Sequence, residues 1–206
     1  MDGRNRNQPC YDMSQPSDRE IYPHLEFCYI TSMLFNTESA LVSAQWMIKL
    51  FEKYQGREID INPHRPLNHL QNIILHGAAL SRYFWPARAG HEYRAAKLRA
   101  VFKMDDASPL KSRELRNQLE HFDEKLDDYL KEPICGHFFP NHFGPDYDGG
   151  GVPQHNFRAY YTDIGVFEIL GQRFEIEPIV NEIIRIHDLL LEFEKAGMRF
   201  PQSKSV

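Results

Sequence analysis

The stretch Ser108–Lys131, SPLKSRELRNQLEHFDEKLDDYLK, is the most regular part of the chain and the starting point for the fold prediction. A serine that suits a helix cap is followed by Pro109, which is tolerated in the first helical turn. The apolar residues then recur at the three- and four-residue spacing of a buried helical face. They are Leu115, Leu119, Phe122, Leu126, Tyr129 and Leu130. We therefore predict one continuous helix from Ser108 to about Lys131.

Four more helices are predicted on either side of this stretch. Their expected spans are about Leu25–Tyr54, Leu67–Trp85, His91–Met104 and Pro178–Ala196. The first contains no Pro or Gly, and the second is apolar nearly all round, which predicts a place at the centre of a bundle. Gly56, Pro86 and Gly197 supply stop signals after three of these helices.

A β pattern precedes the last helix. Three short runs are separated by turn residues and predict a small antiparallel meander: Phe157–Tyr161, Val166–Leu170 and Arg173–Ile176. The predicted fold class is mainly α, a helical bundle of four to five long helices with this small antiparallel β meander before the last helix.

The predicted domain organisation is one helical domain over residues 24–200. A loop at 133–153, rich in Gly, Pro and aromatic residues, and the meander at 157–176 elaborate that domain. Residues 1–23 are polar and contain three prolines, so we expect a disordered amino-terminal arm. Residues 201–206 are expected to form a short tail.

Composition limits the classes of function. A chain of 206 residues, 42% of them hydrophobic, can bury a substantial core. The formal net charge of −5 argues against a broadly basic nucleic-acid-binding surface, so any such site must be local. Cys10, Cys28 and Cys135 form no paired framework, which favours a reduced, cytoplasmic setting. No signal peptide is recognisable, and no apolar stretch approaches the length of a membrane span.

A compact acid–base set lies inside the predicted helix Ser108–Lys131. Arg116 is a permanent cation whose planar fork suits phosphate, and His121 carries the side chain that titrates near neutral pH. Asn117 and His121 are one helical turn apart and therefore neighbours, and Arg116 and Glu120 have the same relationship. These residue types together suit cleavage of a phosphodiester without a metal. The structural alternative is an ordinary solvated helix face.

The set Arg116-Asn117…His121 resembles the R-x4-6-H motif of HEPN domains, a helical family that contains many metal-independent ribonucleases. The resemblance covers about Leu25–Glu132 as an architecture and only these three residues as a motif. It implies that His121 acts as general base or acid on the ribose 2′-OH, that Arg116 stabilises charge on the phosphate, and that Asn117 orients the pair. The products implied are a 2′,3′-cyclic phosphate and a 5′-OH.

The resemblance also implies partners. RNA would be the substrate, a homodimer would form through the motif helix, and an antitoxin-like partner would fit a toxin or defence setting. We expect Arg82 and Arg113 to bind the substrate. The runner-up is a non-catalytic helical interaction or nucleotide-binding protein, which the acidic balance favours. A third, weaker hypothesis is a small-molecule enzyme that uses the 133–153 loop as a lid over His137 and His142.

A metal site in the same loop is a weaker hypothesis still. The loop gathers donor side chains at Cys135, His137, His142, Asp146 and Asp148. Histidine and thiolate suit zinc, but the spacing Cys-x-His-x4-His matches no standard zinc site. We therefore predict no metal and no cofactor, and interpret the loop as anchored by its aromatic residues.

Overall fold

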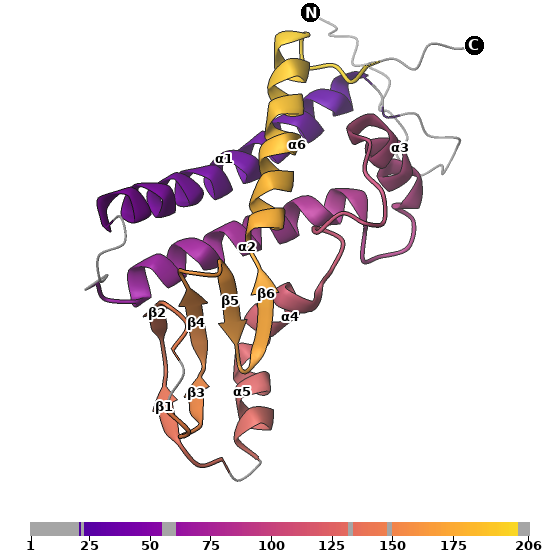
Figure 1. The fold of residues 1–206 in the computed structure, drawn as a ribbon. Helices are drawn as coiled ribbons and strands as arrows, with labels where there is room; N and C mark the ends of the chain where they lie inside the picture. The colour runs from indigo at the N-terminus through magenta and orange to yellow at the C-terminus, as the bar shows by residue number, and fades with distance from the viewer. Residues whose placement is uncertain (1–20, 22, 55–60, 132–133, 148–149, 202–206) are drawn as a thin grey trace, which may run out of the picture.

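The computed structural model describes residues 21, 23–54, 61–131, 134–147 and 150–201. Within these residues the chain forms six helices and six short strands, arranged as in Figure 1. The helices are α1 (Pro23–Tyr54), α2 (His64–Phe84), α3 (Glu92–Phe102), α4 (Glu114–Glu120), α5 (Phe122–Leu130) and α6 (Glu177–Lys195). The strands are β1 (His137–Phe139), β2 (His142–Gly144), β3 (Gln154–Asn156), β4 (Arg158–Tyr161), β5 (Val166–Ile169) and β6 (Gln172–Glu175).

This architecture is mixed α/β, so the prediction of a mainly α bundle with a small meander is wrong. The antiparallel run itself was predicted correctly, because β4, β5 and β6 pair in that order with Tyr160 opposite Phe167 and Phe167 opposite Phe174. The error lies in the segment 133–153, which was predicted as a loop. It contributes β2, which pairs parallel to β4, and β1, which pairs parallel to β3 in a second sheet.

The strands of this segment were not predicted because they are short. His142–Gly144 has three residues, too few for an alternating pattern to be visible in the sequence. The strand is held by its parallel register with β4 and by burial of Phe143, which is 7% exposed and stacks on Tyr160 with ring centroids 5.7 Å apart. Both interactions are supplied by residues more than a dozen positions further along the chain.

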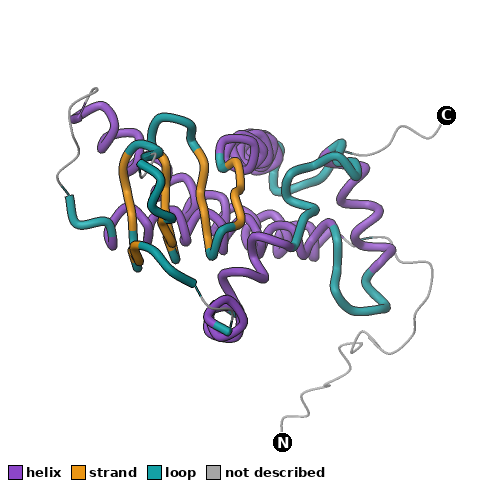
Figure 2. Tube along the Cα trace, turned by 60° about the horizontal axis from the view of Figure 1, so that its bottom comes forward, coloured by secondary structure: helices purple, strands orange, loops and turns teal. Residues whose placement is uncertain are grey.

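The helices α1 and α2 lie side by side and run in opposite directions, and α6 crosses and contacts both (Figure 1). The prediction that α2 is central is confirmed, because it contacts α1, α3, α4, α6 and β4. Its buried apolar side chains are Leu67, Leu70, Ile73, Ile74, Leu80 and Phe84. Figure 2 shows the strands gathered at one end of the α1–α2 pair and α3 at the other. The α1–α2 pair is therefore the common support for two parts of the molecule.

The predicted continuous helix Ser108–Lys131 is wrong in two respects. Residues 108–113 form turns and bends, and the helix that follows is divided at His121, whose φ of −115° and ψ of 35° depart from helical values. The helical hydrogen bonding nevertheless passes through the division. The His121 amide donates to the Asn117 carbonyl at 3.1 Å, and the Lys125 amide donates to the His121 carbonyl at 3.0 Å.

The two halves on either side of His121 contact different elements. Helix α4 buries Leu115 and contacts α2. Helix α5 has no fully buried residue; Phe122 and Tyr129 pack against side chains of the sheet region, where the Arg158 guanidinium carbon lies 3.6 Å from the Phe122 ring centroid. The change of course at His121 therefore lies between a half that contacts α2 and a half that packs against the sheet region.

Two other predictions fall largely outside the described residues. The amino-terminal arm corresponds to residues 1–20 and 22, and most of the predicted tail to residues 202–206. In the part of the chain that the structure describes, no helix combines the length and apolar character needed to cross a lipid bilayer.

Candidate functional site

Arg116 lies on α4 with its side chain held from two sides. Its Nε is 3.3 Å from Oε2 of Glu120, one turn along the helix, and its Nη2 donates to Oδ1 of Asn117 at 3.0 Å. The side chain is only 15% exposed. The contact with Glu120 is an ion pair and not an aligned hydrogen bond, since Nε of Arg116 has no hydrogen-bond partner among the described residues. The guanidinium is therefore fixed mainly by charge and by Asn117.

Glu120 joins this pair to α2. Its second carboxylate oxygen, Oε1, accepts a hydrogen bond from Nη2 of Arg82 at 3.0 Å. One carboxylate thus holds two arginines from different helices. We call Arg82, Arg116, Asn117 and Glu120 the Glu120 cluster; it contains two positive charges and one negative charge.

Three of the five predicted site residues meet in this cluster: Arg82, Arg116 and Asn117. Glu120 is a member of the cluster that is absent from the predicted site residues. The available signal was its spacing of four residues from Arg116, which is typical of a helical ion pair. The sequence holds no signal for the second bond, to Arg82, because that bond depends on how α4 packs on α2.

His121 occupies a different environment. It sits at the junction of α4 and α5 with its side chain 54% exposed, and its Nδ1 is 3.6 Å from Oε2 of Glu124, which is 75% exposed. Across the described part of the chain, no side-chain hydrogen bond or ion pair joins His121 to Arg116 or Asn117. Two of the three motif residues, Arg116 and Asn117, thus lie together, whereas the imidazole of His121 faces solvent.

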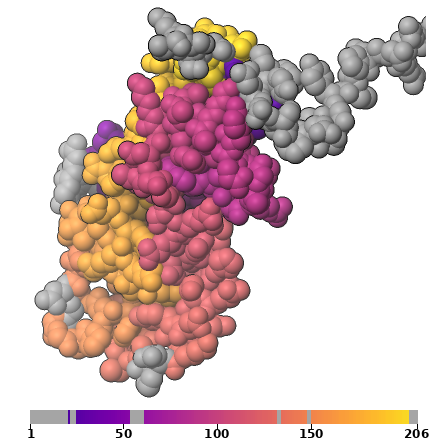
Figure 3. Space-filling model, turned by 90° about the vertical axis from the view of Figure 1, so that its right-hand side faces the viewer, coloured from indigo at the N-terminus to yellow at the C-terminus, as the bar shows by residue number. Residues whose placement is uncertain are grey.

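The surroundings of His121 are acidic. Helix α5 carries exposed carboxylates at Asp123, Glu124, Asp127 and Asp128. Lys131 offsets one of them, with Nζ 2.6 Å from Oδ1 of Asp128. Figure 3 shows the α4–α5 segment on the surface, directly below the segment that contains α3. A polyanion would meet repulsion along α5 and positive charge at the Glu120 cluster, so the α2 side of α4 is the more favourable approach.

Arg113, the fifth predicted residue, lies apart from the others. It precedes α4, and its Nη2 donates to the carbonyl oxygens of Trp85 at 3.1 Å and Pro86 at 3.3 Å. These bonds tie the start of α4 to the end of α2. The structure therefore does not bring Arg113 into the Glu120 cluster.

Two of the donor side chains of the 133–153 segment, His142 and Asp146, make structural bonds. Nε2 of His142 donates to the Pro145 carbonyl at 3.1 Å, and Asp146 accepts two bonds from Arg173, at 2.9 and 3.3 Å. Asp148 lies outside the described residues. Where side chains are described, no group of three or more His, Cys, Asp or Glu residues is placed to hold a metal ion.

A comparison with known proteins finds no matching protein-family model, no matching curated protein and no matching solved structure.

Proposed function

We propose that this protein is a metal-independent, HEPN-like endoribonuclease that acts in the cytoplasm as a homodimer through α4. The observation that supports the proposal is the Glu120 cluster, in which Arg82, Arg116 and Asn117 converge one residue before His121. Two arginines on one carboxylate form a preassembled oxyanion site. A phosphate that replaces the Glu120 carboxylate would meet the same two guanidinium groups, which suit bidentate binding.

In this proposal RNA binds with a phosphate at Arg82 and Arg116. His121 accepts the proton of the ribose 2′-OH as the 2′ oxygen attacks phosphorus. The bond from phosphorus to the 5′ oxygen breaks, and the leaving oxygen takes a proton from the His121 of a second copy. The products are a 2′,3′-cyclic phosphate and a 5′-hydroxyl. Arg116 stabilises the charge that develops on the phosphoryl oxygens.

The dimer is part of the proposal because a single chain leaves His121 exposed, with Glu124 as the one ion-pair partner of its side chain among the described residues. A second α4–α5 segment placed against the first would cover the imidazole and supply the second histidine. Such a partner would also exclude water from the Glu120 cluster and so strengthen its interaction with phosphate.

The test is cleavage of a labelled mixed-sequence RNA in EDTA by the wild type and by His121→Ala, Arg116→Ala and His91→Ala. His91 is exposed and precedes α3, away from the motif, so it is the matched control. We expect cyclic-phosphate ends from the wild type and His91→Ala, and a loss of about 10²-fold or more from His121→Ala. Equal cleavage by His121→Ala would overturn the proposal.

A second candidate is a non-catalytic interaction protein. The observation that favours it is that His121 is exposed and has an acidic neighbour, Glu124, instead of Arg116. Absence of cleavage by every variant, with each shown to be folded by circular dichroism, would favour this candidate. A light-scattering measurement of mass then tests whether the α4 face binds a second copy.

A further inference from the structure

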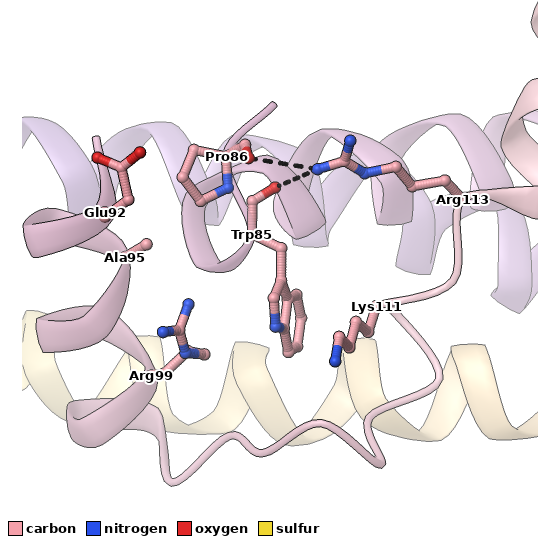
Figure 4. Close-up of a pocket in the computed structure, with 7 residues that line it drawn as sticks. All are labelled: Trp85, Pro86, Glu92, Ala95, Arg99, Lys111 and Arg113. Carbon is pink, nitrogen blue, oxygen red and sulfur yellow. Dashed lines mark hydrogen bonds between the residues drawn. The ribbon is translucent and has the colours of Figure 1, made fainter. Parts of the chain in front are cut away.

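A second, separate cluster of positive charge lines a pocket between α2, α3 and the segment that leads into α4. The pocket has a volume of about 360 Å³. Its lining residues are Trp85, Pro86, Glu92, Ala95, Arg99, Lys111 and Arg113. Figure 4 shows the Trp85 indole extending into the space between Arg99 on one side and Lys111 on the other, with Arg113 above. We call this the Trp85 pocket.

The arginines of the pocket are held by backbone carbonyls. Arg113 donates to the carbonyls of Trp85 and Pro86, and Nη1 of Arg99 donates to the carbonyl of Phe84. These acceptors are uncharged, so neither guanidinium is neutralised by the bond that positions it. Each guanidinium has further N–H groups available to a ligand, since arginine carries five donors.

Lys111 is the third cation. Its Nζ lies 2.8 Å from Oδ1 of Asp106, and the two side chains are 40% and 79% exposed. Ion pairs between side chains this exposed are weak and screened by salt, so a ligand anion can compete for Lys111. The other carboxylate at the pocket is Glu92, whose Oε2 accepts a hydrogen bond from the Gly90 amide at 2.8 Å. The lining therefore holds three cations and one carboxylate, Glu92, and a second carboxylate, Asp106, lies beside it on Lys111.

Trp85 adds a donor and an aromatic face. Its Nε1 is buried and makes no hydrogen bond of ordinary geometry to any described residue. It lies near enough to Asp106 to assist Lys111, the main cause, in lowering the pKa of that carboxyl group. A buried indole N–H without a full partner is a donor that a ligand oxygen would satisfy.

We propose that the Trp85 pocket binds the phosphate group of a small phosphorylated molecule, such as a mononucleotide, with Arg99, Lys111 and Arg113 on the phosphate oxygens and Trp85 against the organic part. Planar guanidinium groups suit phosphate, and indole faces suit bases. The volume lies in the range of small-molecule sites, roughly 300–1,000 Å³. The Trp85 pocket does not include Arg116, Asn117 or His121, so the inference goes beyond the proposed ribonuclease activity.

The test uses tryptophan fluorescence. The chain has two tryptophans, so Trp46→Phe leaves Trp85 as the sole indole. This variant is titrated with inorganic phosphate, with adenosine 5′-monophosphate and with adenosine, at constant ionic strength. We expect saturable quenching by phosphate and tighter saturation by the monophosphate, with adenosine weaker than the monophosphate by tenfold or more. Calorimetry on the wild-type protein gives the same affinities without the Trp46 substitution.

Variants then assign the residues. Lys111→Gln and Arg113→Gln should each weaken binding of the monophosphate about tenfold or more, whereas Lys125→Gln, on exposed α5, should not change it. Arg99 and Arg113 both also bond backbone carbonyls at the end of α2, so each Arg113→Gln result is read together with Lys111→Gln, and Arg99→Gln is left out. Lack of saturation by both phosphate and the monophosphate, or equal binding by Arg113→Gln, would overturn the inference. These outcomes are independent of RNA cleavage.

Discussion

Arg116 and Glu120 form an ion pair one turn apart on α4, with 3.3 Å between Nε and Oε2, and the same carboxylate binds Arg82 of α2. A local helical contact and a contact between helices therefore share one side chain. The side chain of Arg116 is only 15% exposed, and the carboxylate of Glu120 balances its charge. This relationship makes Glu120 the residue on which the geometry of the proposed site depends.

Replacing Glu120 by Gln should lower the free energy of unfolding by about 1–2 kcal/mol, because the largely buried Arg116 loses the charge opposite it. Urea denaturation measures this change. Glu124→Gln is the matched control, since Glu124 is 75% exposed and contacts His121 at 3.6 Å; its effect should stay within about 0.5 kcal/mol. Equal losses from the two variants would contradict the structural role of Glu120.

Gly77 lies where α2 approaches α6 and the residues before α4. A Cβ added there would be 3.3 Å from Cδ1 of Ile183 and 3.4 Å from Cδ2 of Leu110. Gly77→Ala should be within about 1 kcal/mol of the wild type, because the gain in helix propensity offsets this tight contact. Gly77→Val should cost about 1–3 kcal/mol through overpacking.

Thermal unfolding of both Gly77 variants tests this expectation. Ala96→Val, on an exposed position of α3, reports the cost of a β-branched residue in a helix without the packing effect. If Gly77→Val and Ala96→Val lower the stability equally, the close approach of α2 and α6 is not a constraint.

Acid should destabilise the protein through two histidines of α2. Burial lowers the pKa of His69, with Arg65 adding to the effect, and burial lowers the pKa of His76. The folded state thus favours the neutral imidazoles, so their contribution is complete above the unfolded pKa of about 6.5 and is lost as the pH falls below it. The free energy of unfolding should fall between pH 7.5 and 5.5.

The double variant His69→Gln/His76→Gln should flatten that dependence, as measured by urea denaturation at several pH values. His69 stacks on Trp46 with ring centroids 4.2 Å apart, so the variant should also shift the tryptophan fluorescence of the folded protein. A slope unchanged from the wild type over this pH range would show that other groups control the acid response.

The carboxylate of Glu26 connects the first helix to the segment after the last. Glu26 is 3% exposed, and its Oε2 accepts bonds from Nε of Arg199 at 2.7 Å and from the Phe200 amide at 3.0 Å. Arg199→Ala removes the charged partner of a buried carboxylate and should cost about 1–3 kcal/mol. Lys195→Ala, at an exposed position in the last turn of α6, should cost less than about 0.5 kcal/mol in the same urea experiment.

The site was only partly predictable from the sequence. The spacing of Arg116 and Glu120 indicates their ion pair, and the spacing of Asn117 and His121 indicates neighbours on a helix. The sequence gives no sign that Arg82 completes the cluster, because α2 lies more than thirty positions away. The Trp85 pocket was not predicted either, since its residues come from the end of α2, from α3 and from the segment before α4.

Local periodicity determined the long elements of this protein. The apolar spacing in α1, α2 and α6 is repeated over many turns, and the β4–β5–β6 run has turn residues between its strands, so each could be recognised without knowledge of its neighbours. Only the tertiary structure decided the short strands β1, β2 and β3 and the change of course at His121. Three-residue strands carry too little pattern of their own and depend on pairing. The division at His121 separates Leu115, which is buried where α4 contacts α2, from Phe122, which is half-buried beside Arg158 of β4.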